Sequence, residues 1–121
     1  MFELTQEFYF EAAHTLERQH EAQSSRRIHG HTYHAEVTVA GEPDAQGMVL
    51  DLAALRTALQ GVRNQLDHHF LDEVPSLGRP TLENLCRYIA TALQPLLPGL
   101  QQVTVARRAS GDRCTWRRSA A

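Results

Sequence analysis

The sequence predicts a small α+β domain in which an antiparallel sheet of four strands carries two helices on one face. Two long stretches of alternating polarity, at 2–14 and 29–39, indicate strands. Apolar residues recur every three or four positions over 52–66 and 82–93, which indicates two helices. Strands, then helices, then strands is the element order of α+β folds. A length of 121 residues suits one domain, so we expect a single domain over 1–121.

Two long segments of alternating polarity predict the main strands of the sheet, and three histidines lie in phase with their apolar residues. Apolar side chains fall mainly at the even positions of 2–14, and His14 ends that segment in phase with them. After a polar loop, residues 29–39 alternate in the same way, with His29 and His31 in one phase. We expect each of the three histidines to lie on an apolar face.

Shorter segments complete the predicted sheet. A turn over 41–47 predicts that Met48–Leu50 forms a short extra strand in a hairpin with the second strand. Near the C-terminus, the sequence predicts a final β-hairpin with strands at 103–105 and 113–117 and a turn at 110–112.

Both predicted helices have recognisable starts. Asp51 is suited to cap the helix over 52–66, and Thr81 is suited to cap the helix over 82–93. Pro95 follows the second helix and cannot continue it.

Composition narrows the class of protein but does not name a function. The formal net charge is -2 and 42% of the residues are hydrophobic, so we expect neither a nucleic-acid nor a membrane partner. No apolar run approaches the roughly 20 residues that span a bilayer. Glu3 and Glu7 lie where a signal peptide would carry its basic segment, so we expect a cytoplasmic protein.

The histidines form the strongest candidate site. His29 and His31 are two apart in a strand, so their side chains point the same way. If the first two strands pair antiparallel, His14 arrives on the same face. Three neutral imidazoles can hold Zn²⁺ and leave a fourth position open, as in catalytic zinc sites. The alternative is that these are exposed or hydrogen-bonded core histidines without a metal.

Five motifs carry a family resemblance over nearly the whole chain. In order and spacing they resemble the 6-pyruvoyl-tetrahydropterin synthases and the bacterial 6-carboxytetrahydropterin synthases. The motifs are FEAAHTL (10–16), HGHTY (29–33), GMVLDL (47–52), LDHHFL (66–71) and PTLEN (80–84).

The resemblance implies a fold, a cofactor and a reaction. It implies the tunnelling fold (T-fold), a homo-oligomer, usually a hexamer, with active sites at subunit interfaces, and zinc on His14, His29 and His31. The family acts on dihydroneopterin triphosphate, and the implied role is a zinc-dependent lyase in queuosine-type 7-deazapurine or pterin biosynthesis. By motif match, Asp67 and His68 form a proton relay. Thr81 matches a position that helps to hold the pterin, although N-capping explains it equally well.

The chain departs from the family at the catalytic cysteine. The family's cysteine precedes the HGH motif, and this loop contains none; Ser25 lies in its register. A serine hydroxyl carries protons near pH 7 far less well than a thiol of pKa about 8.5. Glu21 or His20 in the same loop could replace it as the acid/base group.

A second departure lies on the penultimate strand. The family holds the guanidine-like edge of the pterin with a glutamate, and that position falls at or beside Arg107. A guanidinium suits a carboxylate, a phosphate or an oxo-rich ring edge. Either Asp112 has taken over the role, or the ligand differs, or the family reaction is no longer performed.

Three hypotheses follow from these residues. The first is a zinc-dependent lyase of the 6-carboxytetrahydropterin synthase type or a close variant. The second is a diverged member acting on or binding a different, more anionic heterocyclic ligand. The third is a non-catalytic binding module with a structural zinc.

Overall fold

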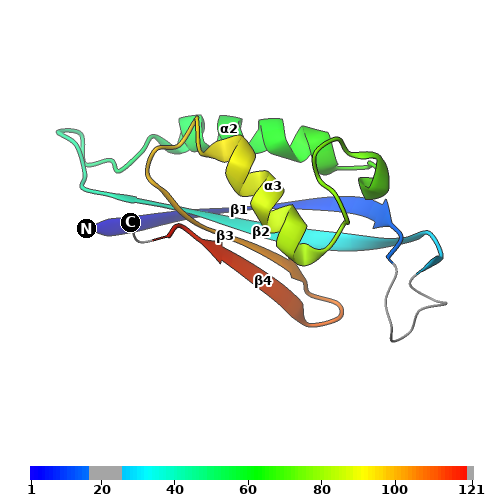
Figure 1. The fold of residues 1–121 in the computed structure, drawn as a ribbon. Coiled ribbons are helices and arrows are strands. Elements are labelled where there is room, and N and C mark those ends of the chain that lie inside the picture. Colours follow the sequence, from blue (N-terminus) through cyan, green and yellow to red (C-terminus); the bar gives the residue numbers. More distant parts are fainter. Residues whose placement is uncertain (17–25, 120–121) are drawn as a thin grey trace.

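A single antiparallel sheet with helices on one face forms the body of the protein (Figure 1). The structure is a computed structural model and describes residues 1–16 and 26–119. The sheet has the order β1-β2-β3-β4, which confirms the predicted fold class. The elements are β1 (Phe2–His14), β2 (His29–Gly41), α2 (Leu52–Leu66), the single turn of 3-10 helix η1 (Leu71–Glu73), α3 (Leu82–Leu93), β3 (Leu100–Arg107) and β4 (Asp112–Arg117).

Strands β1 and β2 pair along their whole length, and this pairing sets the site. The register runs from Phe2 opposite Gly41 to His14 opposite His29. Because side chains alternate between the two faces of a sheet, residues on one face of β1 meet the corresponding face of β2. The histidines therefore lie together at the far end of the ribbon.

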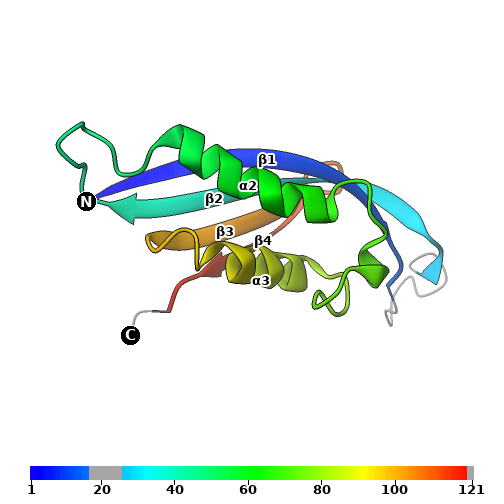
Figure 2. The same cartoon turned by 90° about the horizontal axis from the view of Figure 1, so that it is seen from above.

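The helices cover the face that carries the apolar residues of each strand. Seen from above, α2 runs over β1 and β2, and α3 runs over β3 and β4 (Figure 2). Phe10 stacks on Tyr33 in the centre of this layer, with ring centroids 4.9 Å apart. The other large side chains that are fully buried include Leu55, Leu66, Leu71, Leu85, Ile89, Leu93 and Leu100.

The two predicted N-caps are confirmed. The amide of Ala53 donates to the Asp51 carboxylate at 2.7 Å, and the amide of Asn84 donates to the Thr81 hydroxyl at 3.1 Å. Each side chain satisfies an amide that the first turn of a helix leaves unpaired.

The predicted strand at Met48–Leu50 is wrong. Among the described residues this segment belongs to no strand. The carboxylate of Asp44 accepts hydrogen bonds from the amides of Gln46 and Met48, and the amide of Asp44 donates to the carbonyl of Met48. This closed turn occupies the backbone groups that a hairpin would use, and the chain passes directly into α2.

No helix in the described part of the chain is long and apolar enough to cross a membrane.

Candidate metal centre and proton relay

Three imidazole rings converge at the end of the β1–β2 ribbon. The Nε2 atom of His14 lies 3.0 Å from Nε2 of His29 and 3.1 Å from Nε2 of His31. Three ligands that share one Zn²⁺ at about 2.0 to 2.1 Å in tetrahedral geometry lie roughly 3.3 Å apart. The observed spacing therefore suits a metal ion, and these residues form a possible metal-binding cluster. We call them the histidine triad.

In two of the rings, the hydrogen bond of Nδ1 determines whether Nε2 carries a proton. Nδ1 of His14 lies 3.1 Å from the carbonyl oxygen of Pro80, and Nδ1 of His29 lies 2.6 Å from that of Arg27. A carbonyl only accepts, so both Nδ1 atoms carry the proton, and in neutral rings both Nε2 atoms present lone pairs. Two lone pairs 3.0 Å apart repel each other unless a cation lies between them. The donor set thus fits a metal ion, with the partner of each ring selecting its tautomer.

The surroundings favour the neutral form of His14 and His31. Burial lowers the pKa of His31 to about 4, and the charges of His14 and Arg107 act in the same direction. Burial also lowers the pKa of His14, which is 2% exposed, although its hydrogen bond to Pro80 opposes the shift. Neutral imidazoles are the form that binds metal.

The metal-free protein is expected to lose stability as the pH falls from about 6.5 to about 4. An unfolded histidine takes up its proton near pH 6.5, whereas folded His31 does so only near pH 4. Between these values the unfolded state binds more protons, so protonation favours unfolding. Denaturation midpoints of chelator-treated protein measured from pH 7 to pH 4 check this. The His31→Gln variant should show a shallower fall, and identical curves for both proteins would contradict the assignment.

The predicted pair of Asp67 and His68 forms a turn that is tied to β1. Nδ1 of His68 lies 2.9 Å from the Asp67 carboxylate. The other oxygen of that carboxylate accepts the amide of Glu11 at 2.9 Å, and the amide of His68 donates to the carbonyl of Glu11 at 2.6 Å. The hydrogen bond from Glu11 lowers the pKa of Asp67, and its pairing with His68 and Arg63 adds to this effect. An ionised Asp67 therefore orients the imidazole of His68.

The turn holds His68 in an uncommon backbone conformation. Its φ is 58°, in the left-handed region that is uncommon for residues other than glycine. The ring is 76% exposed. Among the described residues, no hydrogen bond joins it to the histidine triad.

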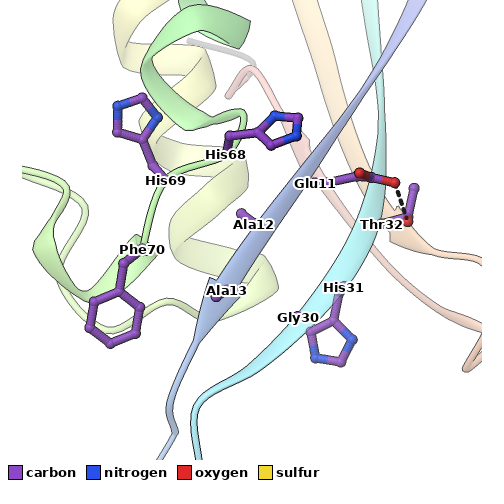
Figure 3. A pocket seen from close by; sticks show the side chains of 9 residues that line it. All are labelled: Glu11, Ala12, Ala13, Gly30, His31, Thr32, His68, His69 and Phe70. Carbon is purple, nitrogen blue, oxygen red and sulfur yellow. Dashed lines mark hydrogen bonds between the residues drawn. The ribbon is translucent and has the colours of Figure 1, made fainter.

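A cavity of about 500 Å³ is lined by one residue of the triad and one of the Asp67–His68 pair (Figure 3). His68 lines it from the turn after α2 and His31 lines it from β2, on opposite sides of β1. The structure therefore brings the triad together and brings Asp67 and His68 together, and one residue of each group, His31 and His68, lines the same hollow.

The three residues predicted to bind the ligand, Arg107, Asp112 and Thr81, make contacts with other residues of the protein. Arg107 ends β3, with a side chain that is 20% exposed and paired to Asp112 at 3.1 Å. Thr81 uses its hydroxyl to cap α3 and follows Pro80, whose carbonyl holds His14. The three candidates to replace the thiol lie outside the described residues: Ser25, Glu21 and His20.

Sequence reasoning missed three contributors to the site. Tyr33 is 1% exposed, and its hydroxyl is buried without a hydrogen-bond partner. Its phase with His31 along β2 was a signal that could have found it. Burial raises the pKa of Tyr33 to about 12, against the opposing charge of Arg107. The backbone groups of Pro80 and Glu11 gave no comparable signal.

The sheet, the two helices and the histidine triad together define a T-fold domain with a candidate catalytic metal centre. The sequence profile of the 6-pyruvoyl tetrahydropterin synthase family matches residues 3–119. The chain belongs to this family, whose members are pterin-metabolising lyases. The predicted resemblance is confirmed.

Individual relatives support the same placement. The 6-carboxy-5,6,7,8-tetrahydropterin synthase of Synechocystis sp. is 37% identical over 112 residues, covering 87% of this chain and 85% of that protein. Dihydroneopterin monophosphate aldolase of Pyrococcus furiosus is 34% identical over 90 residues, covering 74% of this chain and 73% of that protein. The solved structure of 6-pyruvoyl tetrahydropterin synthase from Caenorhabditis elegans is 26% identical, covers 98% of this chain and 96% of its own, and has a TM-score of 0.85.

Proposed function

We propose that the chain is a zinc-dependent lyase of the 6-carboxytetrahydropterin synthase type that acts on dihydroneopterin triphosphate or a related pterin. The observation that carries the proposal is the convergence of three Nε2 atoms 3.0 and 3.1 Å apart, with two of the rings anchored at Nδ1 by backbone carbonyls. Three imidazoles with an open fourth position are a donor set of catalytic zinc sites. Family membership supplies the reaction class.

The zinc would act as a Lewis acid that polarises the oxygen atoms of the substrate's side chain. The protein's own residues would then move the protons. Asp67 keeps the Nδ1 proton of His68 in place, which leaves Nε2 of His68 free to take a proton from carbon or oxygen and to return it. The exposure of the ring leaves that nitrogen accessible to a bound molecule.

The relay would serve a site at a subunit interface. Of the described strands, β1 pairs only with β2, and β4 pairs only with β3. The backbone of Glu11 and Ala13 bonds to the turn after α2, so the unpaired edges are β4 and the first half of β1. We propose that these edges join neighbouring subunits in a homo-oligomer, a hexamer by family resemblance. Association would enclose the exposed ring of His68 and exclude water from the cavity.

In the family a cysteine thiol transfers protons, so in this chain another side chain must take that role. We propose Ser25, which lies in register with it, or Glu21 or His20 from the same loop. A carboxylate or an imidazole is the more effective proton carrier near pH 7. The reaction would belong to queuosine-type 7-deazapurine or pterin biosynthesis in the cytoplasm.

Turnover of dihydroneopterin triphosphate tests the proposal. Zinc-loaded protein is expected to release triphosphate and to form a tetrahydropterin product that chromatography resolves. Chelator-treated protein should be at least about 100-fold slower and should regain its rate when zinc is restored. Absence of turnover from zinc-loaded, oligomeric protein would contradict the lyase assignment.

A second candidate is favoured by one observation, the position of Arg107. Its cationic side chain lies close enough to contribute to the pKa values of both His14 and His31. Such a charge beside the metal centre favours a ligand that is more anionic than a pterin, or richer in oxygen at the edge it presents.

A further inference from the structure

Arg63, in the last turn of α2, contacts both β1 and the Asp67–His68 pair. Its Nε atom donates to the carbonyl oxygen of Tyr9 at 2.7 Å, and its Nη2 atom lies 3.3 Å from Oδ2 of Asp67. The guanidinium carbon lies over the ring of Tyr9, 5.4 Å from the ring centroid. Two donors and one face of a rigid planar group are thus engaged, which fixes the direction of the guanidinium.

The oxygen that Arg63 contacts is the one that His68 uses. Oδ2 of Asp67 lies 2.9 Å from Nδ1 of His68, while Oδ1 accepts the amide of Glu11 at 2.9 Å. Each oxygen of the carboxylate therefore has a donor, and Oδ2 has two. A carboxylate held in this way cannot rotate without weakening at least one of these contacts, because hydrogen bonds depend on direction. Arg63 therefore helps to set the direction of Oδ2.

The ring of His68 takes its orientation from that oxygen. The ring is 76% exposed, and within the described part of the chain its hydrogen bond to Asp67 is the one that holds it. Packing gives so exposed a ring little restraint. Any freedom of the Asp67 carboxylate is therefore passed on to the imidazole.

Arg63 also belongs to the set of contacts that fastens this turn to β1. The outward-facing backbone groups of β1 bond in succession to the segment 63–69: the Tyr9 carbonyl to Arg63, the Glu11 amide to the Asp67 carboxylate, the Glu11 carbonyl to the His68 amide, and the Ala13 amide to the His69 carbonyl. The last two bonds are between backbone groups and do not need Arg63. The turn should therefore stay folded when Arg63 is replaced, while the carboxylate loses one of its donors.

We propose that Arg63 is a positioning residue of the proton relay, which holds Oδ2 of Asp67 where that oxygen accepts the Nδ1 proton of His68. The ring of His68 then keeps the tautomer in which Nε2 is unprotonated and can take a proton from the substrate. The guanidinium does this with two donors in one plane, one on the strand and one on the carboxylate, and a lysine ammonium cannot reproduce that geometry. The inference rests on the proposed function because it adds a residue to the same relay.

Kinetics and nitrogen NMR of Arg63→Met test the assignment. With dihydroneopterin triphosphate, the zinc-loaded variant is expected to have a kcat about tenfold or more below that of the wild-type protein and a KM within about twofold. A misaligned base slows the chemical step rather than binding. In protein labelled with nitrogen-15 at histidine, the His68 ring, assigned with His68→Asn, should carry its proton on Nδ1 in the wild type at about pH 8. Arg63→Met should show both tautomers.

Two further variants separate geometry from charge and from general effects on α2. Arg56→Met is the matched control and should behave as the wild type, because Arg56 lies two turns earlier in α2, is exposed, and its side chain makes no hydrogen bond or ion pair within the described residues. Arg63→Lys keeps the charge but cannot hold Tyr9 and Asp67 together, so its kcat should stay at least about threefold below that of the wild type. This milder variant carries the same test if Arg63→Met loses its zinc or its circular dichroism signal.

The outcomes distinguish the positioning role from the proposed function. An unchanged kcat or an unchanged His68 tautomer in Arg63→Met would overturn the role of Arg63, and so would an equal loss in Arg56→Met. Wild-type behaviour of Arg63→Lys would assign the effect to charge alone and would also overturn it. A wild-type protein without turnover would contradict the lyase assignment, whereas the tautomer of His68 would still decide whether Arg63 positions the pair.

Discussion

Replacing His31 with alanine is expected to reduce the zinc affinity by more than about 100-fold. Loss of a single group that merely orients a metal ligand typically costs 10- to 100-fold in affinity, and loss of the ligand itself costs more. His31 supplies one of three Nε2 atoms, 3.1 Å from that of His14. It is half-buried, whereas His14 is fully buried in the core, so His31→Ala removes a ligand with less disturbance of packing.

Metal analysis after dialysis against a zinc buffer measures this effect. The wild-type protein should hold one zinc per chain, and His31→Ala should retain almost none. His34→Ala is the matched control, because His34 lies on the same strand and points to the opposite face. The stabilisation of the wild-type protein by zinc should disappear in His31→Ala. Full zinc content in His31→Ala, or equal loss in His34→Ala, would exclude the triad as the metal centre.

Replacing His68 with asparagine is expected to lower kcat by about 10²- to 10⁴-fold and to leave the zinc content unchanged. That range is the usual contribution of one general acid or base. Asparagine is the suitable replacement because it tolerates the left-handed backbone at φ 58° better than alanine does. The measured loss would then report the missing imidazole rather than a strained turn.

The dependence of kcat on pH separates proton transfer from a structural role. In the wild-type protein one limb of the profile should report the acid/base group of the relay, and His68→Asn should lose that limb. His69→Asn is the control for the turn, since Nδ1 of His69 contacts the backbone carbonyl of Asp67, at 2.8 Å, and not its carboxylate. A loss in His69→Asn as large as that in His68→Asn, or an unchanged profile in His68→Asn, would contradict the assignment.

Much of the fold could be read from local patterns. Alternation over 2–14 predicted β1 with its observed bounds, and capping by Asp51 and Thr81 predicted where the helices begin. Those signals are strong because they depend on neighbours within one strand or one helical turn. The wrong strand at Met48–Leu50 rested on a short apolar run, which does not distinguish a strand from a segment that crosses between layers.

Strand periodicity placed His14, His29 and His31 in phase, and the family resemblance completed them as a triad, which the antiparallel pairing of β1 and β2 brings together. The sequence also identified Asp67 and His68 as neighbours. The packing of the folded chain revealed that the Pro80 carbonyl selects the tautomer of His14 and that the Glu11 amide favours the ionised form of Asp67. Because every residue apart from proline carries the same backbone donor and acceptor, a backbone partner 56 or 66 positions away leaves no mark in the sequence.

The same reason applies to Tyr33 and Arg107. Their residue types could be read from the chain, but the lack of a hydrogen-bond partner for the buried Tyr33 hydroxyl and Arg107 Nε is a property of the packed interior. Three contacts set the positions of these side chains: the β2–β3 register, the stacking of Tyr33 on Phe10, and the ion pair of Arg107 with Asp112. Local sequence patterns fix which face a side chain takes, whereas the packing of distant segments decides which buried polar atoms find a partner.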